Sequence, residues 1–208
     1  MTTTLTRTDI AYHEAGHAVA YWAVGIHVCG VGVDEHERDG FVMVPGRWRR
    51  STTPAADAIC CLSGYAAELR LGRISGANSL ATIITPSHDL FMSIIETADG
   101  HDVMDLLSDY FFNRLDALRF ASKMGRWATE LVATGRAWGA IGSLAHQLLA
   151  GNGVMQGSVA QDVIATAWGP VDRTEAPVLD LAKEWGKRGI LPLRRKPHRT
   201  PTLMNSAR

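Results

Sequence analysis

The spacing of apolar residues divides most of the chain into amphipathic helices. Apolar side chains recur at intervals of three and four residues, which is the pattern of helices that bury one face. Helices are predicted, with approximate bounds, over residues 9–24, 54–71, 86–98, 102–124, 126–150 and 158–168. The glycines between residues 125 and 142 leave the breaks between the later helices open.

Capping residues mark the ends of the first two predicted helices. Thr8 precedes the first helix as its N-cap, and Gly25 follows it as a stop. Thr53 and Pro54 form a cap-and-proline start for the second helix, which ends before Gly72. Both helices are therefore expected to have well-defined ends.

Residues 26–45 follow a different pattern. Small and β-branched apolar residues alternate around a polar centre that contains Asp39-Gly40, which predicts two short strands joined by a turn. The whole pattern predicts a mainly α fold with a small β-hairpin. At 208 residues the chain can form one domain with a substantial core. We expect that domain to span residues 1–170 and a basic, partly flexible tail to span residues 171–208.

Composition excludes several classes of protein. Hydrophobic residues make up 46% and charged residues 20%, as in ordinary globular proteins. Lys plus Arg and Asp plus Glu number 21 each, so no net charge indicates a nucleic-acid or anionic-membrane partner. The N-terminus lacks a secretory signal, and its most apolar run is far shorter than the roughly 20 residues that span a bilayer. We expect a cytoplasmic protein without a membrane span.

The first predicted helix carries the motif "HEAGH", which places His13 and His17 four residues apart. On a helix such residues differ by about 40° in direction and about 6 Å in height, so both imidazoles can reach one metal ion. Zinc accepts neutral imidazole nitrogen, and a catalytic zinc has three protein ligands and an open position. The motif therefore predicts two of three zinc ligands.

Glu14 follows the first histidine and lies on an adjacent flank of the same helix. Its carboxylate is placed to act as general base toward a zinc-bound water, which is the chemistry of metal-assisted amide hydrolysis. No further histidine follows at the metzincin spacing, so the third ligand must lie downstream. Four residues are candidates that spacing alone does not separate: Glu68, His88, Asp89 and Glu96.

Three segments resemble the zinc protease domain of the FtsH-type, AAA-linked metalloproteases. "AYHEAGHAVA" resembles the zinc helix of that family, "LSGYAAELRLG" resembles its next helix, and "SHDL" resembles its S-N-D-L element, in the same order. The resemblance implies an FtsH-like helical zinc peptidase fold with Asp89 as the third zinc ligand. Under this reading Glu68 is a surface carboxylate or an outer carboxylate that supports a ligand.

The chain also departs from this family. It contains no G-x-x-x-x-G-K-[ST] phosphate loop, so any ATPase or adaptor would act in trans. We expect an ATP-independent zinc metallopeptidase that cleaves unfolded or flexible polypeptides, with strand residues 28–33 offering backbone groups to the substrate. The alternative is a zinc-binding protein-interaction module with little or no proteolytic activity. The basic stretch "GRWRR" is explained equally well by a solvated loop, so a nucleic-acid partner is not expected.

Overall fold

The computed structural model describes residues 6–34, 39–45, 54–72 and 97–169. Within these ranges the chain forms six helices and a small antiparallel sheet, which confirms the mainly α class. The helices are α1 (Arg7–Ala23), α2 (Pro54–Leu71), α5 (Ala98–Ser108), α6 (Arg114–Ala133), α7 (Gly135–Ala150) and α8 (Gly157–Trp168). The strands are β1 (Gly30–Asp34), β2 (Asp39–Met43) and β3 (Val154–Gln156).

Helix α1 begins at a capping box. The Thr6 hydroxyl accepts a hydrogen bond from the backbone N–H of Asp9 at 3.3 Å, and the Asp9 carboxylate accepts one from the backbone N–H of Thr6 at 2.8 Å. The predicted cap at Thr8 is therefore wrong, because this reciprocal pair starts the helix two residues earlier. The predicted stop is confirmed, since α1 ends before Gly25, whose φ of 81° suits glycine.

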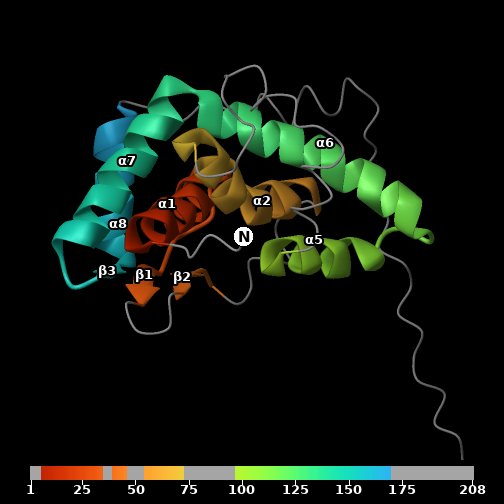
Figure 1. Ribbon diagram of the computed structural model, residues 1–208, viewed down its shortest axis with the longest axis horizontal. Helices are drawn as coiled ribbons and strands as arrows, with labels where there is room; N and C mark the ends of the chain where they lie inside the picture. The colour runs from red at the N-terminus through yellow and green to blue at the C-terminus, as the bar shows by residue number, and fades with distance from the viewer. Residues whose placement is uncertain (1–5, 35–38, 46–53, 73–96, 170–208) are drawn as a thin grey trace, which may run out of the picture.

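Helix α1 lies at the centre of the molecule. Helices α2 and α7 pack against it, and the sheet lies along another side (Figure 1). The crossing of α1 and α2 is close because Gly16 has no side chain: a Cβ there would lie 2.6 Å from the carbonyl oxygen of Ser63 and 3.1 Å from the Cα of Gly64. This close approach brings the "HEAGH" turn of α1 directly against α2.

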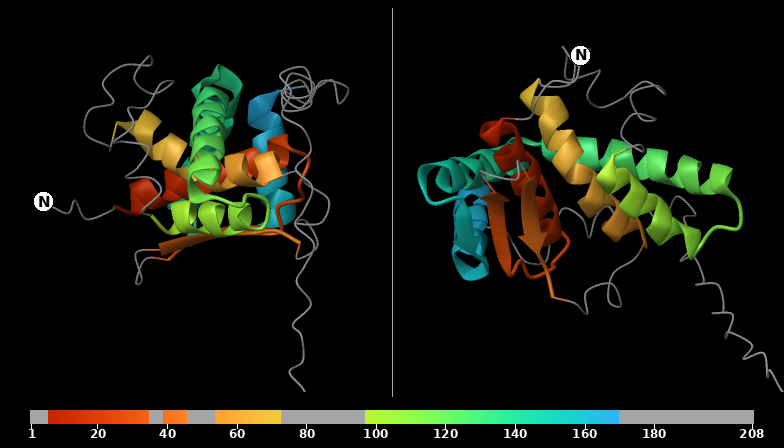
Figure 2. Two further views of the ribbon diagram at one scale, coloured as in Figure 1. Left: turned by 90° about the vertical axis from the view of Figure 1, so that its right-hand side faces the viewer. Right: turned by 60° about the horizontal axis from the view of Figure 1, so that its bottom comes forward.

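The sheet has the order β2-β1-β3, with both pairs antiparallel. Val31 and Val33 of β1 are buried, and the sheet lies against one side of α1 (Figure 2). The predicted hairpin is confirmed as β1 and β2, but the third strand was not predicted. Strand β3 covers only Val154–Gln156, which is too short to show an alternating pattern.

The breaks between the later helices differ from the prediction. The single helices predicted over 102–124 and 126–150 are wrong, since the chain breaks after Ser108 and again at Thr134. The side chains of Asn113 and Thr134 accept backbone N–H groups at the starts of α6 and α7, so caps set these ends. Gly125 lies inside α6 and does not break it. The predicted helix over 86–98 falls almost wholly outside the described residues, as does the predicted tail.

The C-terminal end of α2 is tied to the junction of α6 and α7. The Arg70 guanidinium donates to the carbonyl oxygen of Val132 and, at 3.3 Å, to that of Thr134. It also lies 4.6 Å from the centre of the Trp138 ring, as in a cation–π contact. Among the described helices, none combines the length and the apolar character needed to cross a membrane.

Candidate metal centre

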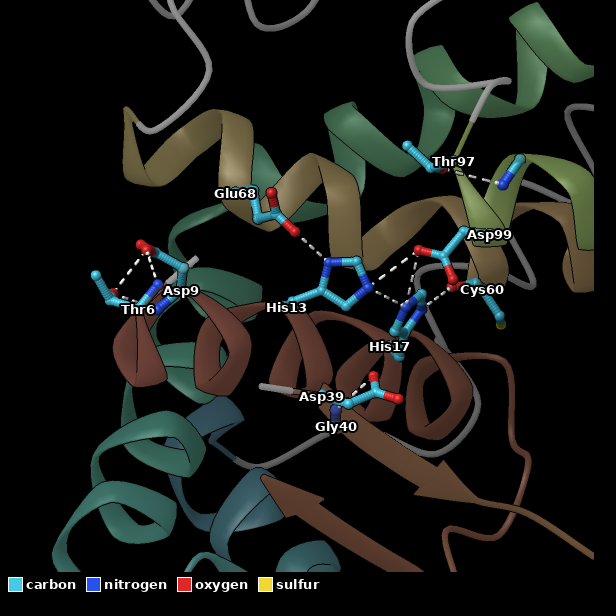
Figure 3. A network of polar contacts seen from close by, with 11 residues as sticks. Thr6, Asp9, His13, His17, Asp39, Gly40, Cys60, Glu68, Thr97 and Asp99 are labelled. Atoms are coloured by element: carbon cyan, nitrogen blue, oxygen red, sulfur yellow. Dashed lines mark hydrogen bonds and ion pairs between the residues drawn. The ribbon is translucent and has the colours of Figure 1, made fainter. Parts of the chain in front are cut away.

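Two side chains of α1 and one of α5 converge on a single point. The Nε2 atoms of His13 and His17 lie 2.9 Å apart. The Oδ2 atom of Asp99 lies 3.0 Å from Nε2 of His13 and 3.4 Å from Nε2 of His17 (Figure 3). These three residues form a group that could hold a metal ion.

Local helical structure places each of the three side chains. His13 and His17 are one turn apart in the middle of α1, so they lie on the same face. Asp99 lies in the first turn of α5, where the helix dipole favours a carboxylate. The hydroxyl of Thr97 caps this helix by accepting the backbone N–H of Gly100 at 3.3 Å, so the position of Asp99 follows from a defined helix start.

Each histidine is oriented by a contact at its other ring nitrogen. Nδ1 of His17 donates to the backbone carbonyl of Cys60 at 2.8 Å, since a carbonyl can only accept. Nδ1 of His13 contacts the Glu68 carboxylate (Figure 3). With both Nδ1 protons donated to α2, the two Nε2 lone pairs point to the convergent point. Metal-binding histidines are commonly oriented in this way.

The donor set fits a zinc ion. Two imidazole lone pairs and a carboxylate oxygen face one another, and such groups repel unless a cation lies between them. Zinc ligands at about 2.0–2.2 Å in tetrahedral geometry are separated by about 3.3–3.6 Å. The separations here run from 2.9 to 3.4 Å, so small side-chain movements would admit the ion.

Without a metal, a proton takes the place of the cation. Burial by itself lowers the pKa of His13, but its hydrogen bonds to Asp99 and Glu68 and their negative charges outweigh burial and raise the pKa to about 10. Burial would raise the pKa of Asp99, yet the two histidines hold it well below its usual range. The metal-free site therefore pairs a protonated His13 with an ionised Asp99.

Glu14 lies beside this group and is buried between α1 and the sheet. Its relative exposure is 7%, and a Cβ added to Gly40 of β2 would lie 2.6 Å from its Oε1. Burial raises the pKa of Glu14, and the nearby charges of His17 and His13 lower it only in part. A carboxyl group with a raised pKa next to a metal-binding group suits proton transfer.

The structure brings together part of the site predicted from sequence. His13 and His17 converge and Glu14 lies next to them, as the motif predicts. Glu68 touches the Nδ1 side of His13, away from the convergent point, which fits an outer supporting role. Asp89, the third ligand implied by resemblance, lies outside the described residues. His88 and Glu96 lie outside them as well.

Asp99 was not among the candidates. One predicted helix ended near Ala98 and the next began at Asp102, so Asp99 fell between them. In the structure α5 begins at Ala98 and includes Asp99. One local signal was present: Thr97, two residues earlier, can cap a helix whose first turn then contains Asp99. The convergence with α1 depends on long-range packing and has no local signal.

The strand that could offer backbone groups to a substrate is not the predicted one. The prediction named residues 28–33, but β1 pairs with β2 on one side and β3 on the other, so its backbone groups are used. Strand β2 instead lies at the edge of the sheet in the described part of the chain. No protein family model matches the chain, and no curated protein matches it.

Proposed function

We propose that the chain is a zinc metallopeptidase that hydrolyses peptide bonds in unfolded or flexible polypeptides without ATP. The observation that carries the proposal is the convergence of His13, His17 and Asp99 beside the buried carboxyl group of Glu14. Two histidines and one carboxylate are a common ligand set of hydrolytic zinc sites, and they leave a position open. The adjacent carboxyl group supplies the base that hydrolysis needs.

In this proposal each residue has a defined task. His13, His17 and Asp99 hold the ion, and Glu68 and the Cys60 carbonyl fix the two imidazoles. Zinc, when bound, supplies a Lewis acid that polarises the attacking water and the substrate carbonyl.

Glu14 moves the proton. Its carboxylate takes a proton from the water as the water oxygen attacks the carbonyl carbon, and it then gives that proton to the leaving nitrogen as the C–N bond breaks. Burial raises the pKa of Glu14, which favours the protonated form that the second transfer requires.

The edge of β2 supports an extended polypeptide as the substrate. The backbone N–H of Gly40 donates to the carboxylate of its neighbour Asp39 at 2.8 Å, and not to β1. Gly40 is also the residue against which Glu14 packs. A peptide that pairs with this edge would displace the Asp39 contact and run past the proposed base.

The resemblance to FtsH-type peptidase domains belongs to the same proposal. It adds two expectations: the zinc peptidase activity itself, and Asp89 as the carboxylate ligand. The geometry of the described residues favours Asp99 in that place. Single substitutions distinguish the two carboxylates: Asp99→Asn should weaken zinc binding if Asp99 is the ligand, and Asp89→Asn should weaken it if Asp89 is the ligand.

Paired variants test the function. In Glu14→Gln we expect zinc to be retained and cleavage of an unfolded protein such as casein to be lost, because only the base is removed. In His13→Ala we expect both to be lost. Glu130→Gln, an exposed change on α6, is the matched control and should cleave as wild type does.

Two results would contradict the proposal. If Glu14→Gln cleaves as fast as wild type, Glu14 is not the base. If wild type holds zinc but cleaves no unfolded substrate, and captures a folded partner instead, the interaction-module alternative replaces the peptidase.

A further inference from the structure

Three residues at intervals of four on α2 face the two histidines of α1. Cys60 offers a backbone carbonyl to His17, and Glu68 offers a carboxylate to His13. Gly64 lies midway between them and offers no side chain at all. Glycine is a poor helix former, and Gly64 lies in the interior of an 18-residue helix. It therefore lowers the stability of α2 relative to alanine, which indicates that another requirement favours glycine at this position.

The surroundings of Gly64 give that reason. A Cβ built on it would lie 2.7 Å from Nε2 and 2.8 Å from Cδ2 of His13, and closer still to Nε2 of His17. These are the two nitrogens that face the convergent point (Figure 3). A methyl group at residue 64 would therefore overlap both imidazole rings in the positions from which they could bind a metal ion at about 2.0–2.1 Å.

Gly16, across the helix crossing, has a different role. A Cβ on Gly16 would meet the carbonyl oxygen of Ser63 at 2.6 Å and the Cβ of Ala67 at 2.9 Å, which are rigid parts of α2. The three nearest neighbours of a Cβ on Gly64 are instead the tips of two side chains, which can rotate away. A side chain at residue 16 would disturb the helix packing, whereas one at residue 64 would disturb the histidines.

We infer that Gly64 is a positioning residue beside the metal site, whose missing side chain leaves the space in which the two imidazoles converge. The inference rests on the proposed metal function. Gly64→Ala would push the imidazoles off the convergent point and away from Glu68 and the Cys60 carbonyl. The fold of α2 would tolerate the change, because alanine is the better helix former.

The first test compares Gly64→Ala with Gly139→Ala, a matched change in α7 where an added Cβ meets nothing within 4 Å. Zinc affinity is measured by competition with a chromophoric chelator, and the coordination is read from the visible spectrum of the Co²⁺-substituted protein. We expect Gly64→Ala to weaken zinc by more than about 100-fold, beyond the usual range for an outer contact, and to lose the tetrahedral Co²⁺ bands. Gly139→Ala should stay within about twofold of wild type.

The second test uses metal-free protein and measures the melting temperature. In a His13→Ala/His17→Ala background the Cβ has room, so we expect Gly64→Ala to raise the melting temperature by about 2–4 °C. With both histidines present the same change should give no rise or a fall. A double-mutant cycle of this kind isolates the contact between residue 64 and the imidazoles.

Each outcome decides the question. Wild-type zinc affinity in Gly64→Ala, or equal shifts in the two backgrounds, would overturn the inference. Failure to fold in both backgrounds would also overturn it, because residue 64 would then serve the packing of α2. Failure to fold only with the histidines present would support it. If wild type itself binds no zinc, the proposed function fails, whereas the melting-temperature cycle still reports on the contact.

Discussion

The two halves of the candidate metal centre are built differently. The histidine half lies in the crossing of α1 and α2, where His13 and His17 each have a second contact on α2 and a glycine between them. The carboxylate half is a single side chain, Asp99, in the first turn of α5. The side chain of Asp99 is 24% exposed, against 19% for His13 and 10% for His17. The difference suggests that the helix crossing is preorganised and that α5 completes it.

The largest effect should come from removing a ligand of the histidine half. Four-ligand structural zinc sites bind with about 10–16 kcal/mol, so the loss of one ligand corresponds to about 3 kcal/mol, or 100-fold or more in affinity. We expect His17→Ala to show at least this loss in a zinc titration. His27→Ala, an exposed histidine just beyond α1, is the control and should bind as wild type does. Equal losses in both variants would contradict the assignment.

A smaller effect is expected from the outer contact of the same half. Glu68→Ala removes the carboxylate that orients His13, and such outer contacts contribute about 10- to 100-fold to metal affinity. Glu68→Gln keeps an acceptor for Nδ1 and should recover most of the loss. If Glu68→Gln weakens zinc as strongly as His17→Ala does, Glu68 is itself a ligand and the comparison between the two halves breaks down.

The pH dependence of zinc binding tests whether His13 is protonated beside Asp99 in the metal-free protein. Because the pKa of metal-free His13 is about 10, zinc must displace a proton at neutral pH. We therefore expect affinity to rise by about tenfold per pH unit between pH 7 and 9, measured against a chelator of known pH dependence. A flat profile would contradict a protonated His13.

Zinc affinity should rise with pH, whereas the stability of the metal-free protein should fall as the pH rises. The folded pKa of His13 is raised above the unfolded value near 6.5, so its contribution is fully present below pH 6.5 and is lost as the pH rises through about 10. We expect the free energy of unfolding to fall between pH 7 and 10. The fall should be absent in His13→Ala, and urea unfolding at several pH values would measure both.

The smallest effects on zinc affinity are expected at the helix caps of α5 and α1. Thr97→Ala removes the hydroxyl that accepts the N–H of Gly100, a loss of about 1 kcal/mol in helix stability. Since Asp99 lies in the turn that this cap starts, zinc affinity should fall by only a few-fold. Thr6→Ala, the equivalent change at α1, destabilises the helix with the preorganised half and should affect zinc less. The reverse order would indicate that α5 is the more rigid half.

The sequence could predict the histidine half because its information is local. His13, Glu14 and His17 lie within two turns of one helix, so periodicity and the motif are enough to place the histidines on one face of α1 and Glu14 on an adjacent flank. Glu68 was a candidate, but only the packing of α2 on α1 shows that it reaches Nδ1 of His13.

The carboxylate half could not be predicted in the same way. Asp99 is remote from α1 in sequence, and its approach depends on how α5 packs beside α2. The same limit applies to β3, where Val154–Gln156 gains its strand structure from pairing with β1 and not from its own pattern. Where contacts between distant segments determine the structure, the periodicity of one segment cannot predict it.

The most direct test of the account is zinc titration of wild type, Asp99→Asn and Asp89→Asn under the same conditions. We expect one zinc per chain in wild type, a loss of about 100-fold in affinity in Asp99→Asn, and wild-type affinity in Asp89→Asn. No zinc binding by wild type would contradict the metal centre. Wild-type affinity in Asp99→Asn together with a loss in Asp89→Asn would contradict the carboxylate half and move the third ligand to Asp89.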